Sequence, residues 1–346
     1  MNQTESRKDE HIKIALDENV AASHNYWDDV KLIHNALPEI NECDIDLSTK
    51  IFNKKLGAPI IISAMTGGYK KAKKINENLA SAAEKFQIGM GVGSQRAAIE
   101  NPDLVETYSV VKDFDIPLRF ANIGASQLVI WGKDKTLKNA EKMVEMIDAH
   151  AFFVCLNFLQ EATQPEGESD AKGCLDAIRH LAENLSVPVL IKESGAGISS
   201  EVAKRLSKTK IAGFDVGGLG GTSFSAIEYF RAKNIKDGFH ERCGKTFWNW
   251  GIPTPTSIID VGEVVSWKKP IIATGGIRNG LDAAKALVLG ASAAGVAHTF
   301  LKPANQGVDA IVFEVDTMIK ELRAAMFLVG AENVSKMTEV DAELWI

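Results

Sequence analysis

The chain has 346 residues, of which 45% are hydrophobic and 24% are charged, and its formal net charge is −6. This composition is typical of a globular protein, and the acidic balance argues against a nucleic-acid partner. No apolar run reaches the ~18 residues of a membrane span, and the polar first residues contain no apolar signal segment, so we expect a cytoplasmic protein without a membrane partner.

Eight short apolar runs are predicted to be β-strands. Each is a continuous apolar run rather than an alternating one, which is typical of parallel strands that are buried on both faces. In chain order they span residues 58–64, 87–92, 118–122, 152–157, 187–192, 213–216, 270–274 and 293–297.

Segments with helical periodicity lie between these runs. The clearest are residues 74–86, 138–149, 281–289 and 311–329, where apolar residues recur at three- and four-residue spacing. Eight alternations of strand and helix predict an α/β fold, and glycine-rich ends on six strands favour a closed (β/α)8 TIM barrel over an open doubly wound sheet.

Two segments fall outside this alternation. Residues 1–56, with a helical signal near 5–16, are predicted to be an N-terminal extension that packs on a single barrel domain, residues 57–346. Residues 232–255 are long for a connection in such a barrel. This second stretch is interpreted either as a lid or as a folded surface insertion.

Polar residues and glycines follow the first three strands, where barrel enzymes place their active sites. The glycines after Ala64-Met65-Thr66 allow a flat ligand to approach the backbone closely, although a plain tight turn has the same pattern. The second strand leads into GSQR (93–96), whose arginine suits a phosphate or the surface. The third strand ends at Asn122, an amide that can both donate and accept.

The fourth and fifth strands also end in polar residues. Asn157 is followed by Gln160, Glu161 and QPEGE (164–168), a pattern that indicates a metal or polar-ligand site or else a solvated loop. Lys192 ends an apolar strand, where a buried lysine is costly unless it is paired or bound to an anion. Lys192 therefore indicates either an anionic ligand, such as a reduced flavin, or a structural Lys–Glu pair.

The last three strands end in the segments GGLGGTS (217–223), GGIRNG (275–280) and Ala297-His298. Loops after the seventh and eighth strands form the common phosphate site of barrels. The two glycines and the arginine in the loop after the seventh strand (275–280) therefore favour a phosphate-bearing cofactor. No GxGxxG opens a first βαβ unit, which argues against a Rossmann domain.

These motifs cover nearly the whole chain. Their sequence and order resemble those of the type 2 (FMN-dependent) isopentenyl-diphosphate delta-isomerases. The forms KESGAG and WGIPT are similar to archaeal members. The matching motifs are RKDEH (7–11), SAMTGG (63–68), GSQR (93–96), ANIGA (121–125), LN (156–157) with QE (160–161), QPEGE (164–168), KESGAGIS (192–199), GGTS (220–223), WGIPT (250–254) and GGIRNG (275–280).

The resemblance implies a function. The enzyme would convert isopentenyl diphosphate to dimethylallyl diphosphate by a 1,3-allylic proton shift in isoprenoid biosynthesis, with reduced FMN as the acid and base at N5. The implied cofactors are FMN, Mg2+ and a pyridine nucleotide, expected to be NADPH, that reduces the flavin. The implied partners are a small-molecule diphosphate and further copies of the chain in a homotetramer or octamer.

The resemblance also assigns roles to individual residues. Glu161 would bind Mg2+, a hard cation that prefers oxygen ligands, and Gln160 would orient the proton path. The flavin ring and ribityl chain would be held by Ala64, Met65, Thr66, Ser94, Asn122 and Lys192, its phosphate end by Thr222, Gly275, Gly276, Arg278, Ala297 and His298, and the substrate by Arg7, Lys8, Ser94, Gln95, Arg96, Asn157 and Gln160.

The chain departs from the family pattern at Cys155, one of four scattered cysteines, where many members have histidine. A thiol provides no cationic hydrogen bond, so the diphosphate would be held with one fewer donor. Two rival functions stay open. One is an FMN-dependent 2-hydroxy-acid oxidase, for which His298 is the candidate base near the last strand, and the other is a catalytically impaired flavin- or diphosphate-binding paralogue.

Overall fold

The computed structural model of the chain describes residues 3–345; residues 1, 2 and 346, which the predicted domain ranges include, lie outside the described residues. Eight parallel strands close into a barrel in the order β10-β11-β4-β5-β6-β7-β8-β9, which confirms the predicted fold and all eight predicted strands. They are β4 (Ile60–Ile62), β5 (Gly89–Gly91), β6 (Arg119–Gly124), β7 (Ala151–Cys155), β8 (Val189–Lys192), β9 (Gly213–Asp215), β10 (Ile271–Thr274) and β11 (Ala293–Val296).

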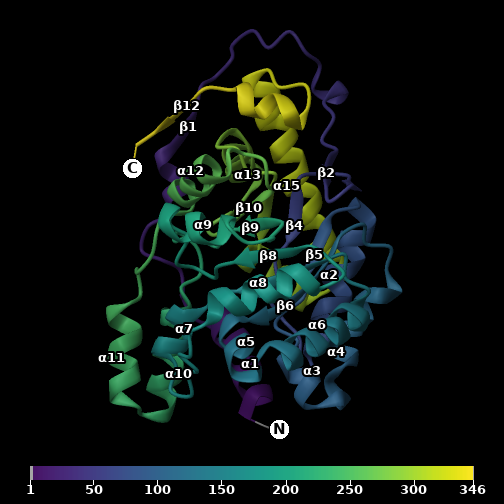
Figure 1. Cartoon of the computed structure of the whole chain (residues 1–346). Coiled ribbons are helices and arrows are strands. Elements are labelled where there is room, and N and C mark those ends of the chain that lie inside the picture. Colours follow the sequence, from purple (N-terminus) through teal and green to yellow (C-terminus); the bar gives the residue numbers. More distant parts are fainter. Residues whose placement is uncertain (1–2, 346) are drawn as a thin grey trace.

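Helices follow every barrel strand and surround the barrel (Figure 1). Their apolar faces and the outward faces of the strands form the larger of two buried cores. They are α2 (Ala72–Phe86), α3 (Arg96–Glu100), α4 (Glu106–Ser109), α5 (Ala125–Trp131), α6 (Lys133–Ile147), α7 (Phe158–Thr163), α8 (Cys174–Asn184), α9 (Ser200–Ser207), α10 (Phe224–Ile235), α11 (Gly238–Thr246), α12 (Thr254–Val265), α13 (Gly280–Val288), α14 (His298–Gln306) and α15 (Val308–Val329).

The smaller core fills the inside of the barrel. The rings of Phe120 and Phe153 stack there with centroids 4.5 Å apart, packed with the other inward-facing apolar side chains. Ile51 and Leu56 belong to the same core and come from a hairpin of β2 (Thr49–Ile51) and β3 (Lys54–Leu56). Because this hairpin leads directly into β4, it closes the amino-terminal end of the barrel and leaves the opposite end for a ligand.

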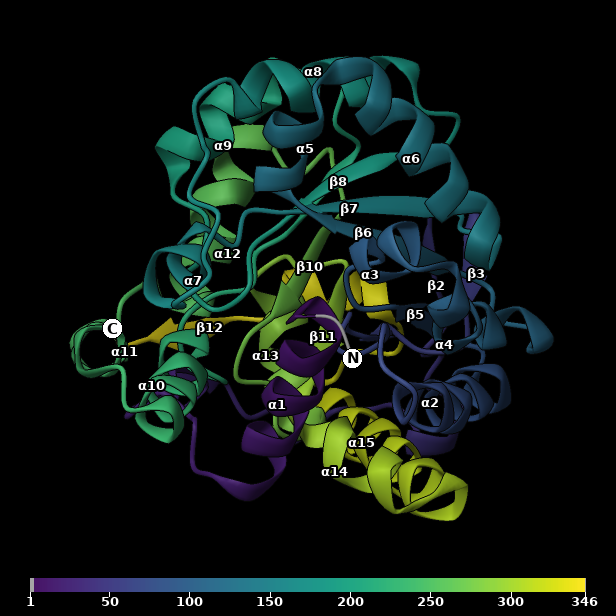
Figure 2. The ribbon, with the colours of Figure 1, turned by 90° about the horizontal axis from the view of Figure 1, so that it is seen from below.

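The N-terminal segment crosses that opposite end. Helix α1 (Gln3–Asp17) contains the predicted helical signal and lies across the barrel mouth in Figure 2, where it is purple. The chain then continues through short elements beside the barrel, and its β1 (Val30–Leu32) pairs with β12 (Ala342–Leu344) at the other end of the chain. The predicted boundary between residues 56 and 57 stays a prediction, since the segment and the barrel pack on each other.

The stretch 232–255, for which the sequence left a lid or a folded insertion open, is largely helical. Helix α10 ends at Ile235, where the chain reverses at Lys236, and α11 then packs antiparallel on α10. The two helices project from the barrel at the lower left of Figure 1. Asp237 caps α11 by accepting from the N–H of His240, and Gly244 allows α11 to approach the backbone of Tyr229 closely. The folded insertion is therefore the alternative that this part of the chain adopts.

No helix within residues 3–345 has the length and apolar character that are needed to cross a bilayer.

Candidate active site

Three adjoining cavities open at the carboxyl-terminal rim of the barrel. Cavity A has a volume of about 480 Å³, cavity B about 160 Å³ and cavity C about 130 Å³. Ala64 and Phe224 line all three, while Lys192 and Ser194 line both A and B. Cavity A alone is in the range of ~300–1,000 Å³ that small-molecule and cofactor sites occupy.

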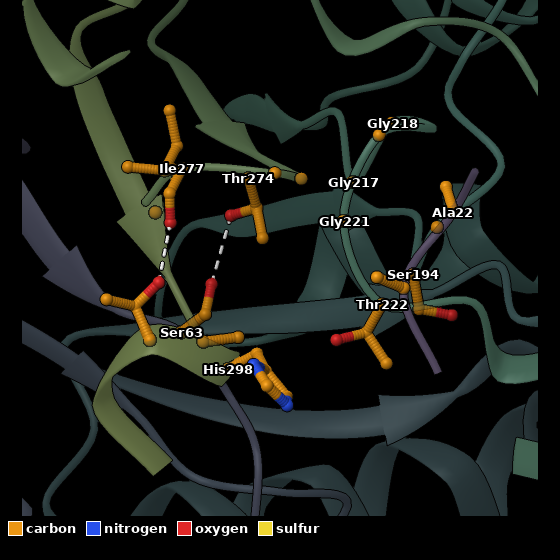
Figure 3. A pocket seen from close by; sticks show the side chains of 18 of the residues that line it. Ala22, Ser63, Ser194, Gly217, Gly218, Gly221, Thr222, Thr274, Ile277 and His298 are labelled. Atoms are coloured by element: carbon orange, nitrogen blue, oxygen red, sulfur yellow. Dashed lines mark hydrogen bonds between the residues drawn. The ribbon is translucent and has the colours of Figure 1, made fainter. Parts of the chain in front are cut away.

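Two glycine loops form one side of cavity A, and Figure 3 labels Gly217, Gly218 and Gly221 of the first of them. A Cβ atom on Gly221 would lie 2.5 Å from the backbone nitrogen of Gly276, and one on Gly275 would lie 2.4 Å from the carbonyl oxygen of Gly218. Gly275 also has a φ of +120°, which other residues rarely adopt. The loops after β9 and β10 therefore pack backbone against backbone and present backbone edges to the cavity, as a phosphate cradle requires.

Hydroxyl groups and an imidazole face cavity A from the other strands. Ser63 and Thr274 form a buried hydroxyl pair at 3.0 Å between β4 and β10, and the side chains of Ser194, Thr222 and His298 lie around the same space (Figure 3). His298 Nε2 bonds to the carbonyl oxygen of Ala15 at 2.9 Å. This imidazole therefore connects the cavity wall to α1.

The N-terminal segment completes cavity A, a contribution that the sequence did not indicate. Residues 18–22 and Asn25 line it. Asn25 Nδ2 donates to the carbonyl oxygen of Gly276 and Trp27 Nε1 to that of Gly275, each at 2.8 Å. These bonds clamp the loop after β10 from outside, and neither residue lies in a motif that would have revealed it.

Arg278, a predicted phosphate ligand, lines cavity A but has its guanidinium on carboxylates. It donates to both oxygens of Asp282 and to both oxygens of Asp28. The hydrogen bonds that Arg278 donates to Asp282 and then to Asp28 raise the pKa of its guanidinium. A phosphate contact from this side chain would have to share or replace those partners.

Lys192 lies at the end of β8 between cavities A and B. Its Nζ is 2.7 Å from Oδ2 of Asp215, which ends the neighbouring strand β9 in register with Lys192. The predicted Lys–Glu pair is therefore wrong, because the partner of Lys192 is an aspartate on the neighbouring strand. Glu193 instead accepts the backbone N–H groups of Ser194 and Ala196, and burial raises its pKa to about 7.

Lys192 and three further cationic side chains line cavity B. Lys8 donates to the carbonyl oxygens of Gly67 and Ser94 and to the Tyr108 hydroxyl, and burial, together with neighbouring Arg7, lowers its pKa to about 7. Arg96 forms a bidentate pair with Glu168. Arg7 has no hydrogen-bond partner among the described residues, so its guanidinium is free to bind an anion.

Glu161 is the one carboxylate among the described residues that line cavity B. It lies in the first turn of α7 beside Gln160 and accepts from Asn157 Nδ2 at 2.8 Å and from the backbone N–H of Glu168 at 2.9 Å. Burial raises its pKa. Within residues 3–345 no group of three or more His, Cys, Asp or Glu could hold a metal.

Several predicted ligand residues have buried polar atoms without partners. These atoms are Oδ1 of Asn122, Oγ1 of Thr66 and Oδ1 of Asn157, none of which finds a hydrogen bond in the described part of the chain. Such groups are rare because each one costs about 1–3 kcal/mol. Their position around cavities B and C fits a polar ligand that would satisfy them.

Gln95 departs from its predicted role. It is fully buried and lines none of the three cavities. Its Nε2 donates to the carbonyl oxygen of Met143 on α6, and its Oε1 accepts from the backbone N–H of Asn122. The side chain therefore connects β6 to a surrounding helix, whereas the other predicted residues of the site line at least one cavity.

Cys155 lines cavity B and lies beside Lys192, its register partner on the neighbouring strand β8. Burial raises the pKa of its thiol to about 12, so the thiol is neutral near pH 7. It contributes no charge to the cavity.

A buried ion-pair network holds α1 over the site. Arg231 on α10 bonds to Glu228 of its own helix, to Glu10 of α1 and to Glu166 of the loop after α7, while His11 bonds to Glu228 at 2.7 Å. Burial alone would raise the pKa of Glu228, but His11 and Arg231 hold it below its usual value. The network connects three separate segments around cavity B.

The comparisons with known proteins agree with this geometry. Residues 160–343 match the family described as FMN-dependent dehydrogenase. Among solved structures, mandelate oxidase with (S)-2-phenylpropionate has a TM-score of 0.67 at 17% identity over 99% of this chain and 98% of that chain. A lactate oxidase of Pediococcus acidilactici has a TM-score of 0.66 at 15% identity over 96% and 86%. At these identities the likeness shows the fold.

Several relatives of higher identity share one name. The isopentenyl-diphosphate delta-isomerase of Thermoplasma volcanium is 48% identical over 96% of this chain and 94% of its own length. The proteins of the same name from Picrophilus torridus and Methanosarcina mazei are 46% and 45% identical over 96% and 97% of this chain and 94% and 91% of their own lengths.

The fold and its glycine cradle define an FMN-dependent (β/α)8-barrel enzyme. Within that class, the chain belongs to the isopentenyl-diphosphate delta-isomerase family and is an isomerase.

Replacing Arg231 by methionine should lower the free energy of unfolding by about 3–5 kcal/mol, because it removes the guanidinium that pairs with the buried Glu228 and leaves that carboxylate with His11 alone. It should also speed proteolysis within α1. The matched control is Arg179→Met, whose pair with Asp176 is exposed and should contribute ~0–1 kcal/mol. Denaturant unfolding and limited proteolysis measure both effects; equal loss in the two variants would contradict the network's role.

Proposed function

We propose that this protein converts isopentenyl diphosphate to dimethylallyl diphosphate in isoprenoid biosynthesis, with FMN in cavities A and C and the diphosphate in cavity B. The observation that carries the proposal is the adjacency of a cationic cavity and a glycine-walled one. Lys192 and Ser194 belong to both, so a ligand in one would touch a ligand in the other.

The residues around cavities A and C fit FMN. The glycine loops would receive the phosphate end, together with Thr222 and the first turn of α14 at His298. Unpartnered Thr66 in cavity C, and Asn122 in the adjoining cavity B, would satisfy polar atoms of the ring and the ribityl chain, together with Ala64 and Met65, which line both cavities, and Ser94 of cavity B. Reduced FMN supplies an acid and base at N5 that can protonate an alkene, after reduction by NADPH.

The protein's own contribution is to bind, orient and exclude water. Arg7 offers the free guanidinium for the diphosphate, while Lys8 and Arg96 would exchange internal partners for it. Gln160 and Asn157 would orient the isopentenyl group, and α1 covers the mouth, which protects a cationic transition state from water. One proton is added to the alkene and a different proton leaves, so no net redox change occurs.

Glu161 fits a metal that arrives with the substrate. Magnesium is usually bound by one or two carboxylates together with substrate phosphates, and cavity B offers one carboxylate among its described residues. We therefore propose that Glu161 binds Mg2+ carried by the diphosphate. We also propose a cytoplasmic homo-oligomer, which rests on the family resemblance alone.

The rival oxidase function shares the barrel but gains no support from the site. Oxidase chemistry requires a free histidine base, and His298 donates its Nε2 hydrogen bond to Ala15. The oxidase structures are 15–17% identical to this chain, against 44–48% for the isomerases. Bleaching of the bound flavin by 2-hydroxy acids would favour the oxidase.

Anaerobic incubation with FMN, NADPH, Mg2+ and isopentenyl diphosphate should yield dimethylallyl diphosphate, because the family and the paired cavities both indicate this reaction. Product is measured by NMR, and omission of FMN or of the reductant should abolish it. A folded, FMN-loaded protein without turnover would contradict the proposal and favour the impaired paralogue, with Cys155→His as the next variant.

The value of kcat/KM should fall about tenfold between pH 6 and pH 8, because the Lys8 ammonium loses its proton near pH 7 and only the charged form attracts a diphosphate. Lys8→Met should have a lower kcat/KM at pH 6 and lack this step. Lys13→Met, an exposed change on the same helix, is the control and should keep the wild-type profile. A step that persists in Lys8→Met would refute the assignment.

Glu161→Gln should lose its activation by Mg2+, because the amide replaces the only carboxylate that the described part of cavity B offers to a metal. The measurement is initial rate against Mg2+ concentration, with Glu183→Gln on the surface of α8 as the control. An unchanged Mg2+ activation curve in Glu161→Gln would exclude this carboxylate as the metal ligand.

A further inference from the structure

A buried ion pair joins the ends of β8 and β9, and only one of its two residues lines the candidate site. Lys192 Nζ and Asp215 Oδ2 are 2.7 Å apart, with side chains 6% and 1% exposed. Lys192 lines cavities A and B, whereas Asp215 lines none of the three cavities. Any effect of Asp215 on a ligand must therefore pass through Lys192.

The pair is poorly suited to a purely stabilising role. Taking two charges out of water is compensated only when the remaining donors and acceptors are also satisfied. Oδ1 of Asp215 has no hydrogen-bond partner among the described residues, and the Lys192 ammonium, with three donors, has Asp215 as its one hydrogen-bonded partner there. Two ammonium donors are left for a group in the cavities.

The register of the barrel leaves the ammonium little freedom. Lys192 and Asp215 are Cα partners on neighbouring parallel strands, and the ammonium also lies over the ring of Phe153, 5.8 Å from its centroid. The other nearby carboxylate, Glu193, uses its Oε2 on two backbone N–H groups. Asp215 alone among the described residues therefore neutralises the ammonium by direct contact.

We propose that Asp215 is a positioning residue that directs the Lys192 ammonium at the electron-rich edge of the bound flavin. This inference rests on the proposed binding of FMN. Without Asp215 the ammonium would lose its counter-ion and the one hydrogen bond that holds it in place among the described residues. Its positive charge would then be less well placed toward a flavin that gains negative charge.

Sulfite tests this charge without turnover. It adds through sulfur to N5 of oxidised flavin, the flavin takes up the electron pair, and the resulting anion is stabilised by a nearby cation. The adduct removes the flavin's visible absorbance, so titration of the FMN-loaded protein gives its dissociation constant. Lys192→Met and Asp215→Asn should each weaken sulfite binding at least tenfold, and the double variant should be no weaker than Lys192→Met alone.

The outcomes separate the possible roles. Wild-type or tighter sulfite binding by Asp215→Asn would overturn the proposal, and so would additive losses in the double variant, since Asp215 would then act independently of Lys192. Asp260→Asn on α12 is the control and should bind sulfite as the wild type does. FMN binding by the wild-type protein is measured first by fluorescence quenching, and its absence would overturn the proposed function itself.

Folding of each variant is checked by thermal melting. If Asp215→Asn does not fold, Asp215→Glu keeps the charge but lengthens the side chain by one methylene, which displaces the carboxylate relative to Nζ. This variant should keep FMN and change sulfite affinity at least threefold. Wild-type affinity would overturn the positioning role.

Discussion

Closure of the parallel sheet brings the ends of all eight strands to one rim, and this constraint places the whole candidate site. Parallel hydrogen bonding sets the register, so Cys155, Lys192 and Asp215 become lateral neighbours although they are separated along the chain. The interior below is filled by a dry core that includes the stacked Phe120 and Phe153. Ligands can therefore enter only above this core.

The rim holds charges that a core optimised for stability would avoid. Lys192 with Asp215, Arg231 with Glu228, and Lys8 among carbonyl groups are all removed from water to a large extent. Such groups destabilise a fold unless they are satisfied, and Oδ1 of Asp215 has no hydrogen-bond partner among the described residues. Of these groups Lys192 and Lys8 line the cavities, where an anionic cofactor and substrate would offer them further acceptors.

The N-terminal segment acts as part of the site rather than as an appendage. Asn25 and Trp27 hold the glycine loop of cavity A, and Arg231 and His298 hold α1 over cavities B and C. Each contact joins residues more than 200 positions apart. Cavity A and the cover over the barrel mouth therefore both depend on the packing of the same segment.

The amino-acid sequence by itself determined the eight strands, the main helices and the positions that end each strand, because these follow from local apolar runs and their periodicity. Only the tertiary structure decided where individual side chains point. Gln95 turns towards α6, Arg278 is held by Asp28 and Asp282, and Lys192 pairs with Asp215 rather than with adjacent Glu193. These choices depend on packing between segments distant in the chain, which local patterns do not encode.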